Sequence, residues 1–442
     1  MSLRQLIALM PRTDQPEDHP MHDAQARPEP APAGRLLVLE PMSSGLTLLA
    51  TARELGLATL VFSHDAGDRV VPEAARQDVD LLVAVDTNDP EALAEAAARE
   101  HARSPLSGVI SGSEFYTDAA ARIAHLLGLP GLPLDTAEAV RDKTRMRAIL
   151  EKAGLRIPRY APVSDAAELA GAAAAVGYPC VLKPAAGSGS IQVSRVDDDE
   201  QLRAAYRAIA EDAQYVFDQP EDGRALLEEY LDGPEYSVEG YVHRGEVTVV
   251  SVTRKLLGAE PYFVELGHVV QADLAPAARA AVVAYTADAV TALGINLGLF
   301  HAEVRITADG PVLIEVGARL AGDRIAELIH LATGVSMRHI VVAAHAGLDR
   351  EPADATGQPV ARYAGVHFLT EPGLEVFHRA DGLEEVERHP RVVELRTYYQ
   401  PGTPVPPARD LRCRLGHVIF TADSPEEEAE LRSWIAATVR ST

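Results

Sequence analysis

Over the first third of the chain, short apolar runs typical of strands alternate with segments that have helical periodicity. Residues 36–39 form a continuous apolar run, which is typical of a strand buried on both faces of a parallel sheet. Short apolar runs also occur at 58–63, 81–85 and 108–111, separated by helical patterns at 46–55, 90–101 and 115–127. This alternation predicts a doubly wound parallel α/β domain over residues 35–134.

The pattern changes after residue 134. Asp135 and Glu138 form a capping-box pair that predicts one helix to about Lys152. A compact α+β stretch follows up to residue 225, and strands at 226–230, 236–242 and 247–254 then predict a larger antiparallel sheet. The first residues form a Pro-rich tail, which is typical of disorder. We therefore divide the chain into 1–34, 35–134, 135–225 and 226–442.

The chain is acidic as a whole. Its 442 residues include 41 Lys and Arg against 65 Asp and Glu, which gives a formal net charge of −24. This charge repels phosphate backbones and anionic lipids, so we expect neither nucleic acid nor a membrane as a partner. No apolar run reaches the ~18 residues of a membrane-spanning helix, and residues 3–10 lack a signal-peptide cleavage site. Cys180 and Cys413 cannot form a disulfide framework or a zinc cluster, and a cytoplasmic location is expected.

A hairpin near residue 309 carries a candidate metal site. If Ala308-Asp309-Gly310 is a three-residue loop, Thr307 faces Pro311 and Glu303 lies directly across from Glu315. The alternate face is then entirely apolar, Ile314 included, which supports this register. Opposed carboxylates ~5 Å apart repel one another unless a cation such as Mg²⁺ lies between them. A solvated face with both glutamates in water is the alternative that the hairpin leaves open.

A Gly/Ser loop offers a candidate phosphate site. Lys183 ends an apolar strand and is followed by Gly187-Ser188-Gly189-Ser190. Backbone N–H groups and hydroxyls of such a loop converge on anions, and lysines such as Lys183 and Lys143 supply charge. A surface turn and a basic helix face are the alternatives, because the spacing is not that of a P-loop.

In their order along the chain, these segments resemble the ATP-grasp superfamily of carboxylate–amine and carboxylate–thiol ligases. The resemblance spans about residues 36–334, and its motifs are D-K at 142–143, V-L-K-P at 181–184, E-E-Y-L-D-G-P-E-Y-S-V-E at 228–239, and H-A-E-V-R-I with I-E-V-G-A-R at 301–319. It implies an ATP-grasp fold that combines the N-terminal parallel α/β domain with a small α+β lid and a larger antiparallel catalytic subdomain. It also implies ATP as co-substrate and one or two Mg²⁺ (or Mn²⁺) ions.

The resemblance assigns roles to individual residues. The ATP-binding residues it implies are Lys143, Lys183, Gly187, Ser188, Gly189, Ser190, Glu228, Glu229, Leu231 and Glu235. Among them the lysines would contact phosphates, Glu228 and the backbone at 229 and 231 would bind adenine, and Glu235 would bind ribose. Glu303 and Glu315 would hold the metal, whose number of ions stays open because Gly317 replaces an Asn ligand of many relatives. Arg319 would stabilise an acyl phosphate and a tetrahedral oxyanion.

Residues 261–268 and 317–322 are most similar to the L-amino acid ligases, which make dipeptides. By this resemblance Glu265 would bind the substrate ammonium and His268 would line the reacting centre, and His301 is grouped with the substrate-binding residues. Asp323 would lie beside the amino-acid pocket. It would suit a polar or basic first amino acid, unless it pairs with Arg324 or another arginine.

We therefore expect an ATP-dependent ligase that joins a small-molecule carboxylate to an amine through an acyl phosphate. Three alternatives stay open: a bicarbonate-activating carboxylase of the same superfamily, a non-catalytic nucleotide-binding protein, and a ligase for a peptide or metabolite amine. The sequence identifies neither substrate, and it leaves the oligomeric state open between a monomer and a homodimer.

Overall fold

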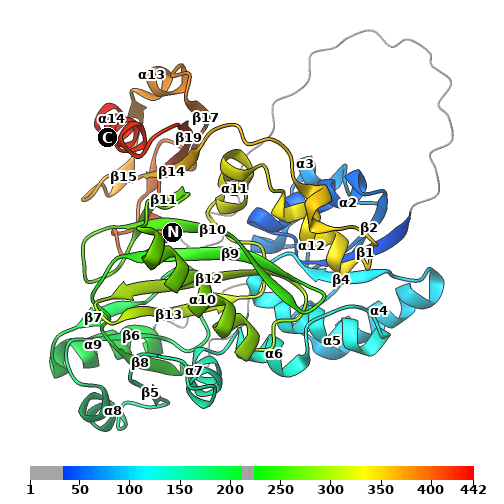
Figure 1. Ribbon diagram of the computed structural model, residues 1–442, viewed down its shortest axis with the longest axis horizontal. Helices are drawn as coiled ribbons and strands as arrows, with labels where there is room; N and C mark the ends of the chain where they lie inside the picture. Colours follow the sequence, from blue (N-terminus) through cyan, green and yellow to red (C-terminus); the bar gives the residue numbers. More distant parts are fainter. Residues whose placement is uncertain (1–32, 212–218, 220–222) are drawn as a thin grey trace.

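The N-terminal region forms a four-stranded parallel sheet (Figure 1). The computed structural model describes residues 33–211, 219 and 223–442, so the expected tail lies outside the described residues up to residue 32. The strand order is β3-β2-β1-β4, with β1 Gly34–Leu39, β2 Leu57–Ser63, β3 Leu81–Ala84 and β4 Gly108–Ser111. The connecting helices include α2 (Thr47–Glu54), α4 (Pro90–Arg103) and α5 (Thr117–Leu127). The predicted parallel α/β fold of this region is confirmed.

Both faces of β1 are covered, which explains its continuous apolar run. Leu36 and Val38 belong to a core shared with α2 and with the helices α11 (Ile325–Thr333) and α12 (Met337–His345). Leu37 and Leu39 belong to a second core with α4 and α5. Successive strand residues face opposite sides, so four apolar residues in a row fit a strand between two helical layers.

The single helix expected over 135–152 is instead two helices, α6 (Leu134–Ala139) and α7 (Lys143–Lys152). The Asp142 carboxylate accepts hydrogen bonds from the backbone N–H groups of Thr144 (2.8 Å) and Arg145 (3.2 Å). Because this side chain caps α7, the second helix begins at Lys143.

A four-stranded antiparallel sheet follows α7, and the described residues between 160 and 229 are called here the lid. Its order is β5-β8-β6-β7, with β5 Tyr160–Val163, β6 Cys180–Pro184, β7 Ser194–Val196 and β8 Ala225–Glu229. Two helices, α8 (Leu169–Val176) and α9 (Asp199–Glu211), pack on it over a core of its own. The expectation that residues 226–230 belong to the larger sheet is wrong. The strand β8 pairs with β5 and β6 because Ala225 and Leu227 are buried in the lid core.

The largest sheet is antiparallel and has eight strands. Its order is β13-β12-β9-β10-β11-β14-β19-β17, with β9 Glu235–His243, β10 Glu246–Leu257, β11 Glu265–Val270, β12 Gly298–Thr307, β13 Gly310–Gly317, β14 Tyr363–Leu369, β17 Val392–Thr397 and β19 Gly416–Ala422. Helix α10 (Pro276–Ala292) packs on one face, while α11 and α12 lie between the other face and the N-terminal region (Figure 1).

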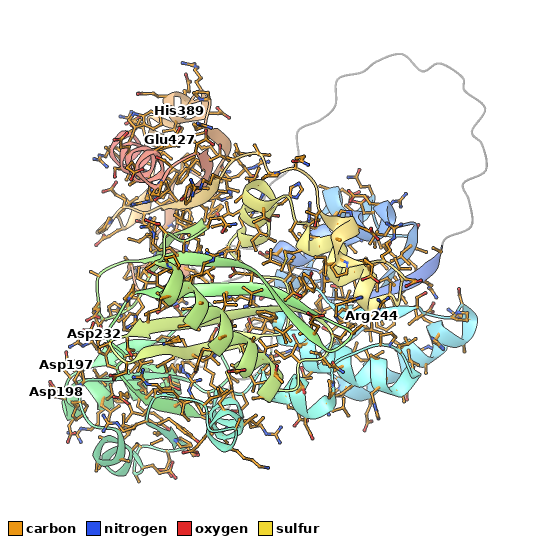
Figure 2. All side chains as sticks on the ribbon, viewed as in Figure 1. Asp197, Asp198, Asp232, Arg244, His389 and Glu427 are labelled. Carbon is orange, nitrogen blue, oxygen red and sulfur yellow. The ribbon has the colours of Figure 1, made fainter. Side chains whose placement is uncertain are left out.

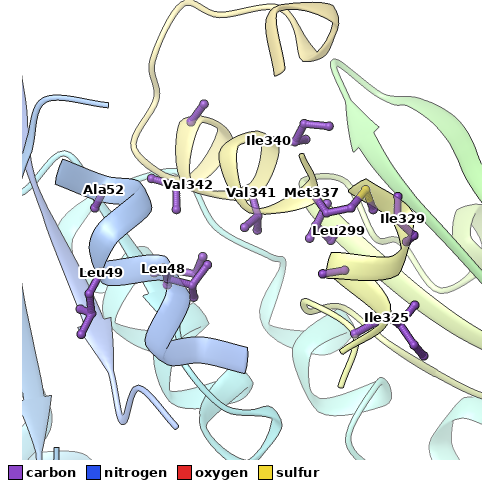
Figure 3. Close-up of a cluster of buried hydrophobic side chains, with 14 of the residues drawn as sticks. Leu48, Leu49, Ala52, Leu299, Ile325, Ile329, Met337, Ile340, Val341 and Val342 are labelled. Carbon is purple, nitrogen blue, oxygen red and sulfur yellow. The ribbon is translucent and has the colours of Figure 1, made fainter. Parts of the chain in front are cut away.

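The helix α12 joins the N-terminal sheet to the eight-stranded sheet, called here the large sheet, through a continuous apolar core. These two sheets together are called the two large sheets below. Figure 3 shows Leu48 of α2 and Val341 of α12 in this core, together with Leu299 from β12. The N-terminal sheet is thereby held against the large sheet. None of the helices in the described ranges has the length and apolar character that crossing a membrane requires.

Candidate active site

A cavity of about 400 Å³ lies where the N-terminal region, the lid and the large sheet meet. Its lining contains every predicted site residue except His301, namely Lys143, Lys183, Gly187, Ser188, Gly189, Ser190, Glu228, Glu229, Leu231, Glu235, Glu265, His268, Glu303, Glu315, Arg319 and Asp323. Residues separated by up to 180 positions in the sequence therefore share one cavity.

Two predicted lysines lie close together at one end of the cavity. The Lys143 ammonium donates to the Gly187 carbonyl (2.8 Å) and pairs with Glu315 (3.0 Å). Lys183, at the end of β6, pairs with Glu228 at 2.6 Å. Burial lowers the pKa of Lys183, and the nearby cations Arg147 and Lys143 lower it further against the opposing effect of Glu228. The Gly/Ser loop thus lies directly beside a cationic pair, as a phosphate site requires.

Glu228 is placed differently from the adenine-binding role that the resemblance implies. One of its carboxylate oxygens accepts from Arg147 Nε and the other from Lys183 Nζ, both at 2.6 Å. Burial alone would raise the pKa of Glu228, but these cations hold it below its usual value. In this arrangement the carboxylate orients Lys183, and it also lines the cavity. Arg147, which the sequence analysis missed, is fully buried and also donates to the Ile314 carbonyl (2.6 Å).

The hairpin of β12 and β13 places Glu303 across from Glu315, as predicted, but by a different route. The predicted three-residue loop is wrong, because Thr307 pairs with Gly310 across a two-residue turn. A bulge at Ile314 then restores the predicted pairing of the two glutamates. It also turns Ile314 into the cavity, while Leu313 takes the core position. The apolar face is therefore real, with Leu313 in the place expected for Ile314.

Lys255 of β10, which the sequence analysis missed, lies among three carboxylates. Its ammonium is 2.8 Å from each of Glu235, Glu265 and Glu303. Burial would lower the pKa of Lys255, but the three carboxylates raise it well above its usual value. A lysine near the end of a largely apolar strand is a detectable signal, although its three partners lie on three different strands.

His301 does not line the cavity, so the structure does not support direct contact with substrate. Its Nδ1 is 3.0 Å from Glu239 and its Nε2 is 3.4 Å from Glu303. Burial lowers the pKa of His301, but the two carboxylates outweigh it and raise the pKa to about 9. The imidazolium therefore lies behind Glu303 and fixes the orientation of that carboxylate.

Arg319 lies on the cavity wall beside Glu114, a third residue that the sequence analysis missed. Its Nε donates to Glu114 at 2.7 Å, and Glu114 also accepts from Arg141 (3.0 Å) and Ser188 (3.1 Å). Burial would raise the pKa of Glu114, but the cations lower it to about 2. Glu114 follows the end of β4, and the carboxyl edge of a parallel sheet is where site residues gather. The position of Glu114 just after a predicted strand could therefore have identified it as a candidate site residue.

Elsewhere on the cavity lining, Glu265 and Asp323 both contact Arg414, and His268 contacts Asp323. The guanidinium pairs with Glu265 at 2.9 Å and with Asp323 at 2.8 Å, and His268 Nε2 is 2.9 Å from Asp323. Of the two possibilities left open for Asp323, the structure shows the second, since the carboxylate pairs with another arginine, Arg414. Arg324 instead pairs with Glu394 at 2.8 Å. Two carboxylates and an imidazole this close could hold a cation, and the Arg414 guanidinium already pairs with both carboxylates.

Comparison with known proteins agrees with this geometry. Family models match residues 49–131 (ATP-grasp N-terminal domain), 176–327 (ATP-grasp domain) and 367–442 (L-amino acid ligase C-terminal domain 2). The chain therefore contains an ATP-grasp domain preceded by an ATP-grasp N-terminal domain. The structure resembles the L-amino acid ligase from Bacillus licheniformis, with a TM-score of 0.78 and 27% identity over 93% of this chain and 99% of that one.

Two further proteins are similar to this chain, one in sequence and one in fold. Dapdiamide A synthase of Enterobacter agglomerans is 32% identical over 56% of this chain, which spans 58% of that relative's length. The N5-carboxyaminoimidazole ribonucleotide synthetase of Thermotoga maritima shares the fold, with a TM-score of 0.66 and 17% identity over 92% of this chain and 99% of that one. At this identity the likeness concerns the fold alone.

Proposed function

We propose that the protein is an L-amino acid ligase. It activates the carboxylate of one amino acid with ATP, joins it to the amine of a second, and releases a dipeptide, ADP and phosphate. The observation that carries this proposal is the cavity itself, in which Lys143, Lys183 and Arg319 lie with Glu303, Glu315 and Glu265. It offers cations for phosphates, carboxylates for a metal, and one carboxylate for an ammonium.

ATP would lie between the lid and the large sheet. Lys143, Lys183 and the loop from Gly187 to Ser190 would hold its phosphates, and the backbone at 229 and 231 would hold adenine. Glu235 would bind the ribose hydroxyls, although it is also 2.8 Å from Lys255 and 3.0 Å from Arg305. Fixed donors aimed at a transferring phosphoryl group supply most of the catalysis in such reactions.

Glu303 and Glu315 fit Mg²⁺ by their chemistry. They present opposed carboxylate oxygens, the hard ligands that Mg²⁺ takes together with phosphates, and both line the cavity. Their cationic partners, Lys255 and Lys143, show that this place favours positive charge. A bound Mg²⁺ would neutralise charge on the phosphates. Gly317 offers no third side-chain ligand, and a Cβ there would contact Arg319 (3.4 Å).

The reaction needs two bond exchanges. A carboxylate oxygen of the first amino acid attacks the γ-phosphorus, the bond to the β–γ bridging oxygen breaks, and ADP leaves. The amine of the second amino acid then attacks the acyl carbon, and the tetrahedral intermediate expels phosphate. Arg319, turned toward the cavity by Glu114, would stabilise the oxyanion of that intermediate.

The attacking amine must lose a proton, and His268, which lines the cavity, is the acceptor that we propose. Burial would raise the pKa of Asp323, but Arg414 and His268 hold it well below its usual value, so the carboxylate is ionised. His268 Nε2 must then carry the hydrogen that it donates to Asp323. Its Nδ1 is buried and has no hydrogen-bond partner among the described residues, so the imidazole would have to turn toward the cavity to accept the proton.

The test is a screen of amino-acid pairs for phosphate release, with mass spectrometry of the product. Glu315→Gln should abolish turnover, since it removes a charge from the proposed metal pair while keeping the shape. Glu385→Gln, at an exposed position, is the matched control and should leave turnover unchanged. Full activity of Glu315→Gln would refute the metal assignment.

A bicarbonate-activating carboxylase is the second candidate, because its fold is the same. Such an enzyme has no need for an ammonium-binding Glu265. ATP turnover that depends on bicarbonate, without amino acids, would identify it. A non-catalytic nucleotide-binding role would give nucleotide binding without phosphate release, even though Lys143, Lys183, Glu303, Glu315 and Arg319 are all present.

A further inference from the structure

Arg414 fills an acidic site at the amino-acid end of the cavity. Four of its five N–H groups are engaged there. Nε donates to the Glu265 carbonyl (3.2 Å), Nη1 to Asp323 Oδ1 (2.8 Å), and Nη2 to Asp323 Oδ2 (3.0 Å) and Glu265 Oε2 (2.9 Å). The side chain is only 5% exposed. The chain thus supplies its own guanidinium to two carboxylates.

An aromatic ring completes the surroundings of this guanidinium. Its central carbon lies 3.7 Å from the centroid of the Phe368 ring, which is the geometry of a cation–π contact. Tyr398 and Leu411 also line this end of the cavity. Two carboxylates and an aromatic face are the groups that recognise a cationic side chain, so the site is chemically suited to arginine or lysine once Arg414 is removed.

The backbone at Asp323 is built to aim this carboxylate at Arg414. Asp323 and Arg324 are consecutive non-glycine residues with positive φ, 52° and 65°. Such a pair is strained and persists where the surroundings hold it. Arg324 is held by Glu394 of β17 at 2.8 Å, while Asp323 is held by Arg414 and His268. The acidic site is therefore fixed from both sides by the C-terminal region.

We propose that Arg414 determines the side-chain specificity for the first amino acid. It neutralises Asp323 and occupies the place of a basic side chain, so the enzyme accepts a small uncharged amino acid and rejects arginine and lysine. This inference rests on the proposed function. A basic side chain would meet a like charge at Arg414 and would find the two carboxylates already paired.

The test compares alanine, lysine and arginine as first substrates for the full-length enzyme and for Arg414→Ala. The readouts are ADP release and the order of residues in the product. The wild type should favour alanine over arginine by at least about tenfold. Arg414→Ala should gain on the order of ten- to a hundredfold in kcat/KM for arginine, the effect of a charge-assisted hydrogen bond. Millimolar guanidinium should refill the vacated site and suppress that gain.

Two further variants keep the result interpretable. Arg414→Lys retains a cation beside Asp323 but gives up the forked contacts, so it should fold and show a smaller gain for arginine. Arg409→Ala, at an exposed position of the same segment, should keep the wild-type preference. Circular dichroism verifies that each variant is folded. A wild type that prefers arginine or lysine, or an unchanged preference in both folded Arg414 variants, would overturn the proposal.

Calorimetric titration with arginine separates this proposal from the proposed function. If Arg414→Ala binds arginine at least about tenfold more tightly than the wild type, while no amino-acid pair supports phosphate release in either, the specificity site stands and the ligase function falls. If amino-acid pairs support turnover but removal of Arg414 changes neither binding nor preference, the ligase function stands and the specificity site falls.

Discussion

At the scale of one residue, Lys255 shows how a single cation allows three buried carboxylates to lie close together. Its single ammonium lies 2.8 Å from three carboxylates to which the proposed function gives three separate tasks, at the ribose, the substrate ammonium and the metal. Buried carboxylates this close destabilise one another unless a cation is shared among them. Lys255 therefore sets the arrangement of all three groups before any ligand binds.

Replacing this lysine tests that role. Lys255→Met keeps a similar length and apolar stem but removes the charge, so Glu235, Glu265 and Glu303 are left without their shared cation. We expect turnover to fall by at least about a hundredfold, the size of effect seen when one charge-stabilising donor is lost from an active site. Phosphate-release kinetics measure it, with Lys152→Met at an exposed position as the control. Turnover within a few-fold of the wild type would contradict the role.

The same residue shows what sequence reasoning could and could not reach. Short motifs contain both partners of an interaction, so the Gly/Ser loop and the opposed glutamates could be placed from their spacing. Lys255, Glu114 and Arg414 each have a partner distant in the sequence, namely Glu303, Arg319 and Asp323, which are 48, 205 and 91 residues away, and no local pattern predicts such pairs. The sequence could not decide between a basic substrate and an arginine as the partner of Asp323, because the charge that satisfies a carboxylate depends on the tertiary fold.

At the scale of elements, the hairpin and the strained turn illustrate how backbone irregularities direct side chains. The bulge at Ile314 compensates for a turn one residue shorter than predicted, so Glu315 returns to its place opposite Glu303. Binary patterning could locate both strands, yet a bulge carries no reliable sequence signature. Similarly, the sequence pattern of β8 predicts a strand of the large sheet, and only its pairing with β5 and β6 shows that it belongs to the lid. Pairing between strands is a tertiary property, so the sequence alone could fix neither the length of the hairpin turn nor the sheet to which β8 belongs.

The turn at Asp323 and Arg324 depends on Glu394 of β17, which gives it a pH dependence. A hydrogen bond from His417 and the charge of Arg324 lower the pKa of Glu394 to about 2. Since the folded pKa lies below the unfolded value, this contribution is present above about pH 4.5 and is lost as pH falls toward 2. Glu394→Gln should lower the free energy of unfolding by on the order of 2 kcal/mol at pH 6.

Urea unfolding of the wild type and Glu394→Gln at pH 6, 4 and 3 measures this difference. The gap between the two proteins should narrow steadily as the pH is lowered. Glu385→Gln, which is exposed, should show no such trend. A gap that stays constant over this range would mean that Glu394 is not held ionised by its partners.

At the scale of the whole molecule, the acidic surplus and the cationic cavity are separate features. Exposed acidic residues such as Asp197, Asp198 and Asp232 lie on the outside of the fold (Figure 2). The net charge of −24 is consistent with solvated surface of this kind. The cations that face the proposed nucleotide are few and buried or half-buried among carboxylates. A small polyanion can thus be bound inside a molecule whose surface repels large ones.

The distribution of apolar cores predicts that the lid opens separately from the rest of the molecule. Leu182 belongs to the lid's own core, whereas Val342 of α12 belongs to the core shared by both large sheets, and both side chains are fully buried. Leu182→Ala should lower the free energy of unfolding of the lid by about 2–4 kcal/mol. Val342→Ala should lower the free energy of unfolding of the shared core by about 1–3 kcal/mol. Because cooperative units follow contiguous packing, hydrogen exchange should rise only over 160–229 in the first variant.

In Val342→Ala, exchange should instead rise together in the N-terminal sheet and the large sheet, since α12 packs against both. Hydrogen-exchange mass spectrometry under native conditions distinguishes the two patterns, with Leu126→Ala as control because that side chain is 55% exposed. Equal acceleration over the whole chain in Leu182→Ala would show that the lid is not an independent unit. A lid that opens alone would let ATP enter and leave while the substrate end of the cavity, fixed by Arg414 and Asp323, keeps its shape.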